Sequence, residues 1–245
     1  MEKLINIGNI PDICFDSPYY FNGKPVPRVT NILSAMLHEE YLMNWAEKMG
    51  QCHMDRNEIL ENAATIGSAV HEWCENFLRY RMVPDFSQTP RTKRNMKMIN
   101  AFNSFMAWIY DLEANHIWRP IMMEVPLVNE LYGGTLDALL EIDGKLCIVD
   151  FKTSNQLSYK YVLQVIAYRY TLKDVYGINV DRLYVLRFNK NKVEMPEELL
   201  LDLEKPDVLE FANNCENMFL ALVYAYYNRN MVESYYKYFT GSERI

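Results

Sequence analysis

The chain has 245 residues, of which 50% are hydrophobic and 13% aromatic, so it can bury a sizeable core and is not generally disordered. Its formal net charge of −7 argues mildly against a protein that coats nucleic acid through bulk charge, although a local basic stripe is compatible with it. The longest apolar run, 218–227, is too short to span a bilayer, and residues 1–16 lack the features of a signal or transit peptide. We therefore expect a cytoplasmic protein without a membrane partner.

Periodicity predicts the following helices and strands in chain order. Residues 1–30 are rich in proline and predict extended structure and turns. Apolar residues at helical or alternating spacing predict helices at 39–49, 57–81, 92–115, 155–176 and 206–228, and strands at 121–128, 135–142, 145–151 and 182–188. Because a strand, a long helix and a strand follow one another from 145 to 188, the two strands should pair in parallel inside a mixed sheet.

A predicted hairpin at 135–151 carries the most informative side chains. Its two strands are joined by Asp143-Gly144, the dipeptide most typical of a two-residue type I′ turn. If the residues flanking this turn pair, Asp137 comes opposite Asp150, with Cβ atoms roughly 5 Å apart. Two carboxylates this close repel each other unless something positive lies between them. Lys152 follows two residues after Asp150 and therefore shares its face of the strand.

Two acids and a lysine on one face indicate metal-dependent hydrolysis of a phosphodiester. Carboxylate oxygens bind Mg²⁺ or Mn²⁺, the metal lowers the pKa of a bound water, and a lysine beside it can position that water or stabilise the developing charge. The alternative is that Asp137 ends a turn and that Asp150 and Lys152 form an exposed strand edge. The short motif does not by itself decide between these interpretations.

The helix predicted next adds a second part to the motif. Gln164 and Tyr168 stand four residues apart and therefore lie on one helix face. The strand with D-x-K-T-S followed by a helix with Q-x-x-x-Y resembles the PD-(D/E)XK nuclease superfamily, specifically its RecB-like exonuclease branch, and phage exonucleases of this type are similar. The segment 25–33, PVPRVTNIL, resembles an N-terminal signature of such phage nucleases, in which Thr30 would cap the following helix.

This resemblance implies an α/β fold with a central mixed sheet flanked by helices, a restriction-endonuclease-like core, and a helical N-terminal portion. It implies one nuclease domain over 1–245, with an N-terminal extension at 1–56, a catalytic core at 57–190 and a C-terminal helical segment at 191–245. The expected activity is that of a metal-dependent DNA exonuclease that leaves 5′-phosphate and 3′-hydroxyl ends, in phage DNA metabolism or in repair and recombination. A phage protein would act in the host cytoplasm.

The resemblance also assigns roles to individual residues. Gly67 to Glu75 fits the pattern G-x-x-x-H-x-x-x-E, which places His71 among the metal ligands. Lys152 would orient or activate the attacking water, and Gln164 and Tyr168 would hold the catalytic groups or the DNA. Glu75 and Glu124 are weaker candidates, because a helical i, i+4 pair and an acid at a strand edge are common without function. The expected ligands of Mg²⁺ or Mn²⁺ are His71, Asp137, Asp150 and the backbone carbonyl of Phe151.

No iron-sulfur cluster is expected. Some RecB-like nucleases hold one with four cysteines, but the five cysteines here include no C-x-x-C pair and do not gather near the C-terminus. They fit reduced thiols. Their positions are Cys14, Cys52, Cys74, Cys147 and Cys215.

Basic and aromatic residues around the motif suggest where DNA would bind. The densest basic region runs from Arg79 to Lys97 and is either a solvated helix face or a grip on the phosphate backbone. Three tyrosines near the site either stack bases or pack a helix face: Tyr159, Tyr161 and Tyr170. The DNA-binding candidates are Arg91, Lys93, Arg94 and Lys97.

Two other functions fit the same motifs. A site-specific or structure-specific endonuclease would cut closed circular DNA into discrete fragments. A non-catalytic module on a nuclease fold would bind DNA without regard to metal. Neither the polarity of digestion, nor the strandedness of the substrate, nor the oligomeric state is encoded in the motif.

Overall fold

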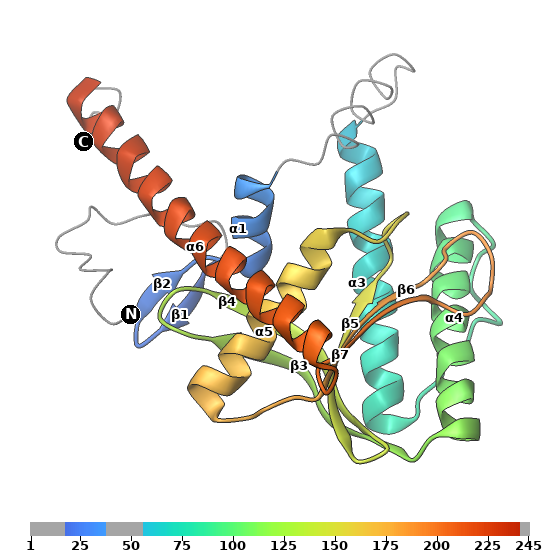
Figure 1. The fold of residues 1–245 in the computed structure, drawn as a ribbon. Coiled ribbons are helices and arrows are strands. Elements are labelled where there is room, and N and C mark those ends of the chain that lie inside the picture. The colour runs from blue at the N-terminus through green and yellow to red at the C-terminus, as the bar shows by residue number, and fades with distance from the viewer. Residues whose placement is uncertain (1–17, 38–55, 241–245) are drawn as a thin grey trace.

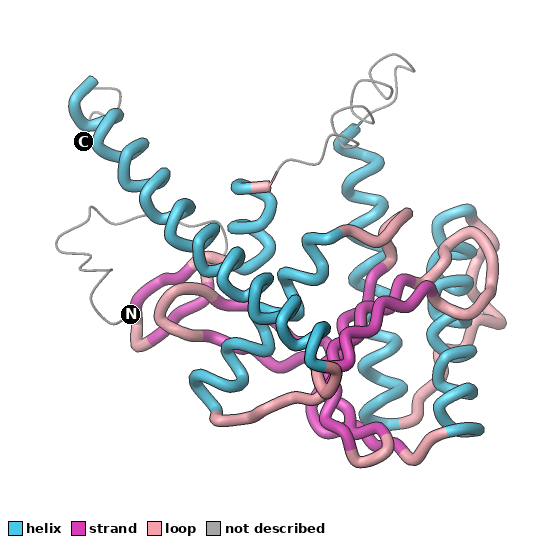
Figure 2. Tube along the Cα trace, viewed as in Figure 1, coloured by secondary structure: helices cyan, strands magenta, loops and turns pink. Residues whose placement is uncertain are grey.

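A computed structural model describes residues 18–37 and 56–240, and the helix predicted at 39–49 lies outside these residues. Its centre is a five-stranded mixed sheet in the order β3-β4-β5-β6-β7, formed by Trp118–Val128, Gly133–Ile142, Lys145–Lys152, Arg182–Arg187 and Glu197–Asp202. Helices lie on both faces of the sheet (Figures 1 and 2). The predicted α/β class with a central mixed sheet is therefore confirmed, and the arrangement is consistent with a restriction-endonuclease-like core.

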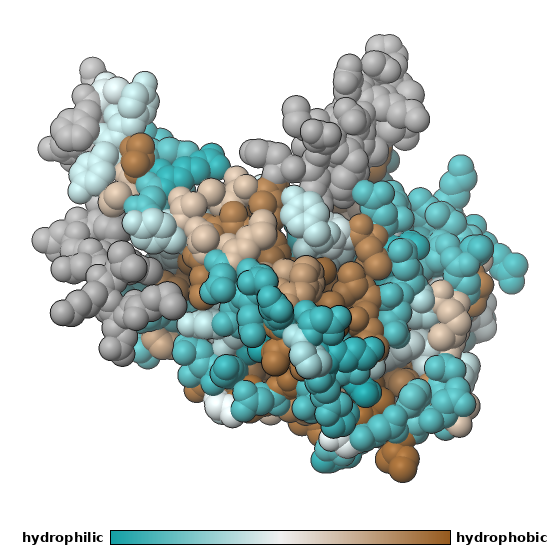
Figure 3. Space-filling view, in the orientation of Figure 1, coloured by the Kyte–Doolittle hydropathy of each residue, from teal (hydrophilic) through white to brown (hydrophobic). Residues whose placement is uncertain are grey.

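Each face of the sheet packs on its own hydrophobic cluster. One cluster joins the sheet to α3 (Arg56–Tyr80) and α4 (Lys93–Asn115), with Phe105, Phe151 and Phe188 fully buried. The other joins it to α1 (Val29–Met36), α5 (Tyr159–Tyr176) and α6 (Pro206–Thr240). Hydrophilic residues dominate the right-hand side of the surface in Figure 3, over α4. The central strand β5 and its neighbours β4 and β6 are mostly buried because both faces of the sheet are covered.

The hairpin of β4 and β5 forms as predicted. Asp143 and Gly144 have φ values of 52° and 75°, the positive values that a type I′ turn requires at both central positions. Pairing runs from Ile142 opposite Lys145 to Ala138 opposite Val149. The same register, continued by one residue, sets Asp137 against Asp150. The prediction of a parallel partner for β5 is also confirmed, because β6 pairs with it in parallel across α5.

The structure corrects several predicted boundaries. The first helix begins at Val29 with Arg28 as its N-cap, so Thr30 lies inside the helix and the predicted capping role is wrong. Helix α5 begins at Tyr159, four residues after the predicted start, because the Ser158 side chain caps it by accepting from Lys160 N at 3.2 Å. Helix α6 continues to Thr240 rather than ending at 228, with no proline or glycine to stop it.

Three strands were not predicted. β1 (Tyr19–Phe21) and β2 (Lys24–Val26) form a small hairpin of their own. β7 lies inside the segment at 191–245 that was expected to be helical, where it pairs antiparallel with β6 and closes one edge of the main sheet. The described residues contain no helix that is both long enough and apolar enough to cross a bilayer.

Candidate metal and catalytic site

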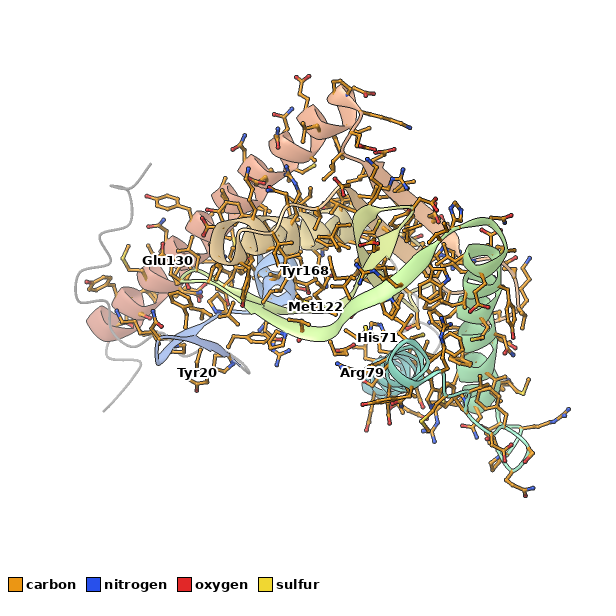
Figure 4. The ribbon with its side chains drawn as sticks, turned by 90° about the horizontal axis from the view of Figure 1, so that it is seen from below. Tyr20, His71, Arg79, Met122, Glu130 and Tyr168 are labelled. Carbon is orange, nitrogen blue, oxygen red and sulfur yellow. The ribbon has the colours of Figure 1, made fainter. Side chains whose placement is uncertain are left out.

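Three elements bring a histidine and two acids together. His71 comes from α3, Glu124 from β3 and Asp137 from β4, and one ligand atom of each lies within 4.8 Å of the others. His71 Nδ1 is 3.3 Å from Asp137 Oδ1. Figure 4 shows His71 on α3, close to β3. Imidazole nitrogen and carboxylate oxygen are metal ligands, so this group could hold a metal ion.

The register of β3 against β4 explains how Glu124 reaches the site. Met123 pairs with Ala138 and Val125 with Leu136, so Glu124 stands across from Asp137. Its φ is 49°, a left-handed value that is uncommon for a residue other than glycine. Such strain persists where the surrounding structure holds it, and it is frequent at functional sites.

Arg79 fixes the helix that faces this strand. Its Nη2 donates to the carbonyl of Met123 at 2.6 Å, and its Nε donates to Glu75 Oε1 at 2.6 Å. This bridge ties α3 to β3 immediately before Glu124. Glu75 is therefore already paired, which makes it a less available ligand than Glu124, although it lines the same cleft.

Asp137 is held by the neighbouring strand. Its Oδ2 accepts a hydrogen bond from the backbone N–H of Phe151 at 2.6 Å, while Oδ1 faces His71. Burial opposes ionisation, but His71, Lys152 and this N–H together lower the pKa of Asp137 below its ordinary value. Burial alone would lower the pKa of His71, yet the carboxylate of Asp137 raises it. Asp137 is thus the acid of the site whose pKa is lowered.

Asp150 is completely buried and poorly satisfied. Among the described residues, no hydrogen-bond donor reaches its Oδ1. Its Oδ2 lies 2.6 Å from Lys152 Nζ, at ion-pair distance but without the geometry of a hydrogen bond. Burial, opposed by Lys152 and reinforced by the charge of Asp137, raises the pKa of Asp150 to about 6. A buried carboxylate oxygen without a donor is costly, and a cation would satisfy it.

Lys152 is held in place from two sides. Its side chain is 15% exposed, and Nζ lies 4.9 Å from the centre of the Tyr161 ring, within cation–π range. Burial disfavours its charge, but the carboxylates of Asp150 and Asp137 outweigh burial and raise the pKa of Lys152. The ammonium is therefore a hydrogen-bond donor at neutral pH. Tyr161 packs against the hydrophobic cluster on its side of the sheet, one of the two roles considered from the sequence, and it also contacts this lysine.

Gln164 and Tyr168 meet as their spacing predicted. Gln164 Nε2 donates to the Tyr168 hydroxyl at 2.9 Å, and both side chains are buried. A Cβ atom at Gly134 would lie 2.5 Å from Tyr168 Cε1, so only glycine lets the ring approach β4 this closely. Burial, together with the charge of Asp150, raises the pKa of Tyr168 well above its ordinary value. A tyrosine that is 2% exposed supports its neighbours rather than stacking on DNA.

A cleft of about 440 Å³ opens beside the histidine and the acids. It lies along one face of α3 and is lined by Gly67, Ser68, His71, Glu72, Glu75 and Glu124. Burial and the charge of Asp137 raise the pKa of Glu124 to about 7. Three acids around one cleft produce a negative potential that attracts cations and repels a bare phosphate.

Some predicted residues lie elsewhere, and sequence reasoning missed others. Arg91, Lys93 and Lys97 line a different cleft at the start of α4. Arg79 was noted only as part of a basic run, and its bridge to β3 has no local sequence signal.

Comparison with known proteins gives limited information. No protein-family model matches the chain, and no curated protein sequence matches it. A solved structure from Eubacterium rectale, described as a “putative exonuclease”, is similar at 15% identity and a TM-score of 0.36, over 67% of this chain and 68% of that one. A likeness at this level carries no argument about activity.

Proposed function

We propose that this protein is a metal-dependent deoxyribonuclease that uses Mg²⁺ or Mn²⁺ and digests DNA from its ends. The observation that carries the proposal is the buried Asp150, whose Oδ1 lacks a donor beside the group of His71, Glu124 and Asp137. Such a cluster is costly without a cation. The proposed catalytic core at 57–190 contains every residue of the site.

The donor set fits a hard divalent cation. The superfamily resemblance implies ligands from His71, Asp137, Asp150 and the Phe151 carbonyl. Of these, His71 and Asp137 lie together in one group of ligand atoms, to which Glu124 adds a further oxygen. When bound, the metal would polarise the phosphate and lower the pKa of a water. The orphaned oxygen of Asp150 and the proximity of His71 to Asp137 both support this fit.

Side chains of the protein would orient the attacking water and position the ligands. Lys152, charged because Asp150 and Asp137 flank it, donates hydrogen bonds that orient the attacking water and stabilise charge on the phosphate. Gln164 holds Tyr168 by a hydrogen bond, and the Tyr168 ring packs against β4 at Gly134. This contact keeps Asp137 on β4 in position. Hydrolysis in this geometry leaves a 5′-phosphate and a 3′-hydroxyl, as the resemblance implies. Processing of DNA ends in repair, recombination or phage replication would use such an activity.

Basic residues outside the reaction centre would contact the phosphate backbone of the DNA. Because the acidic cleft repels phosphate, the substrate needs positive charge nearby, and we assign this role to the start of α4. The residues are Arg91, Lys93, Arg94 and Lys97, all exposed.

A digestion experiment tests the proposal. End-labelled single-stranded, duplex and circular DNA are incubated with Mg²⁺ or Mn²⁺, beside an EDTA control, Lys152→Ala and the exposed control variant Lys173→Ala. We expect linear strands to shorten and circles to survive, with EDTA and Lys152→Ala abolishing digestion and Lys173→Ala leaving it unchanged. Discrete cuts in circular DNA would instead establish an endonuclease. Binding without cleavage under either metal would replace the catalytic proposal with a binding module.

A further inference from the structure

A second cleft, separate from the acidic one, concentrates positive charge. It has a volume of about 340 Å³ and lies between the start of α4 and the connection from β6 to β7. Its cations are Arg91, Lys93, Lys97 and Lys190. Figure 1 shows the β6–β7 connection, in orange, beside the upper end of α4. Lys190 was not among the residues singled out from the sequence.

The cations of this cleft have no acidic partners within the described residues. Elsewhere arginines form ion pairs, as in Arg119 with Glu141 and Arg169 with Glu216, whereas this cleft gathers four cations that have none in the described part of the chain. Lys190 is half-buried, and burial together with the nearby Lys97 and Arg187 lowers its pKa. Gathering like charges costs free energy unless an anion binds among them.

A hydrogen bond to the backbone of Lys190 holds this residue beside the cleft. Asn100 on α4 donates from Nδ2 to the carbonyl of Lys190 at 3.1 Å. This bond joins the β6–β7 connection to α4, so that Lys190 and Lys97 approach from opposite walls of the cleft. A cleft with cations on both walls suits a polyanion that passes between them.

The basic cleft also lies close to the reaction centre in space. Phe188 N donates to the carbonyl of Lys152 at 2.8 Å, and Lys190 follows two residues later. Two residues span at most about 7 Å, and neighbouring strands are about 5 Å apart, so the Cα atoms of Lys190 and Lys152 are at most about 12 Å apart. At about 3.4 Å per nucleotide along one strand of duplex DNA, this distance is at most about four nucleotides.

We propose that the cleft between α4 and the β6–β7 connection binds the phosphate backbone of the DNA strand within about four nucleotides of the scissile bond, with Lys97 and Lys190 as its opposed contacts. This inference rests on the proposed nuclease function for its occupant. It adds Lys190 to the predicted basic residues and gives the strand a route past Lys152. Arg94, on the same turn of α4, does not line the cleft and is not part of this contact.

The test compares two double variants that remove equal charge. Lys97→Ala/Lys190→Ala removes two cations from the cleft, and the control Lys173→Ala/Lys205→Ala removes two exposed lysines that lie outside it. Binding of a fluorescent single-stranded 20-mer is measured by anisotropy in EDTA, where no cleavage occurs, across a salt series. Thermal melting verifies that both variants fold.

The cleft variant should bind more weakly, and its plot of log affinity against log salt should be shallower by about 1.4, since each lost phosphate contact lowers the slope by about 0.7 on single strands. With metal present, its KM should rise while kcat at saturating DNA is unchanged. Equal slopes in the wild type and both variants would overturn the proposal. A shallower slope for the cleft variant of a protein that never cuts DNA would support the DNA-binding cleft and refute the nuclease function. The failure of one proposal can therefore be distinguished from the failure of the other.

Discussion

Replacing Asp150 with Asn removes the carboxylate whose Oδ1 lacks a donor and keeps the size of the side chain. If this oxygen is a metal ligand, the wild type should be stabilised by Mg²⁺ or Mn²⁺ and the variant should not. Binding to the native state alone adds about 2.7 kcal/mol to the free energy of unfolding when the free metal is one hundred times its Kd. At about 2.1 cal/mol/K per residue, a chain of 245 residues unfolds with an entropy of about 0.5 kcal/mol/K, so Tm should rise by about 5 °C.

The assay is a thermal melt of metal-free protein titrated with MgCl₂ or MnCl₂. A hundredfold loss of affinity in Asp150→Asn would leave a stabilisation of about 0.4 kcal/mol at the same metal concentration, which shifts Tm by less than about 1 °C. Asp174→Asn, an exposed acid on α5, is the matched control and should keep the full shift. The assignment of Asp150 as a ligand would be refuted if neither metal changed the Tm of the wild type, or if Asp150→Asn showed the same metal-induced rise in Tm as the wild type.

Three further predictions concern the surroundings of the site. Because the pKa of Glu124 is raised to about 7 and a metal binds the ionised carboxylate, metal affinity should fall at least about tenfold from pH 8 to pH 6 by calorimetry, and Glu124→Gln should weaken that dependence, leaving the part that comes from Asp150 and His71. Gly134→Ala should destabilise the protein by about 1–3 kcal/mol and reduce activity, because its Cβ would overlap Tyr168; unchanged denaturant unfolding would contradict this. Tyr161→Leu should lower kcat by removing the ring beside Lys152, while Tyr161→Phe restores most of it; equal rates in both variants would exclude the cation–π contact.

Sequence pattern sufficed where neighbours along the chain determine geometry. The turn at Asp143-Gly144 and the period of two along a strand placed Asp150 and Lys152 on one face, and the period of a helix placed Gln164 beside Tyr168. The register of a tight hairpin depends on few residues, so the pairing of β4 with β5 could be predicted from the sequence. The parallel pairing of β5 and β6 also followed from element order.

Other features depended on packing between distant segments. Glu124 joins His71 and Asp137 only because β3 takes a particular register and a left-handed φ at that residue, which no local pattern encodes. β7 was missed because EELLLD lacks turn signals and gains its stability as an edge strand on β6. Thr30 was misjudged because a preferred capping residue can also be the second residue of a helix.

Lys152 and Lys190 illustrate the difference between what the sequence predicts and what only the tertiary structure reveals. Lys152 could be found from the sequence because the acid it pairs with is two residues away on the same strand. Lys190 could not, because its significance comes from α4, ninety residues earlier in the chain, which brings Lys97 to the opposite wall of a cleft. The sequence by itself determined the motif and most of the helices and strands, since backbone preferences and side-chain periodicity act locally. Only the tertiary structure decided which charges from distant segments meet, because that depends on how the helices pack against the sheet.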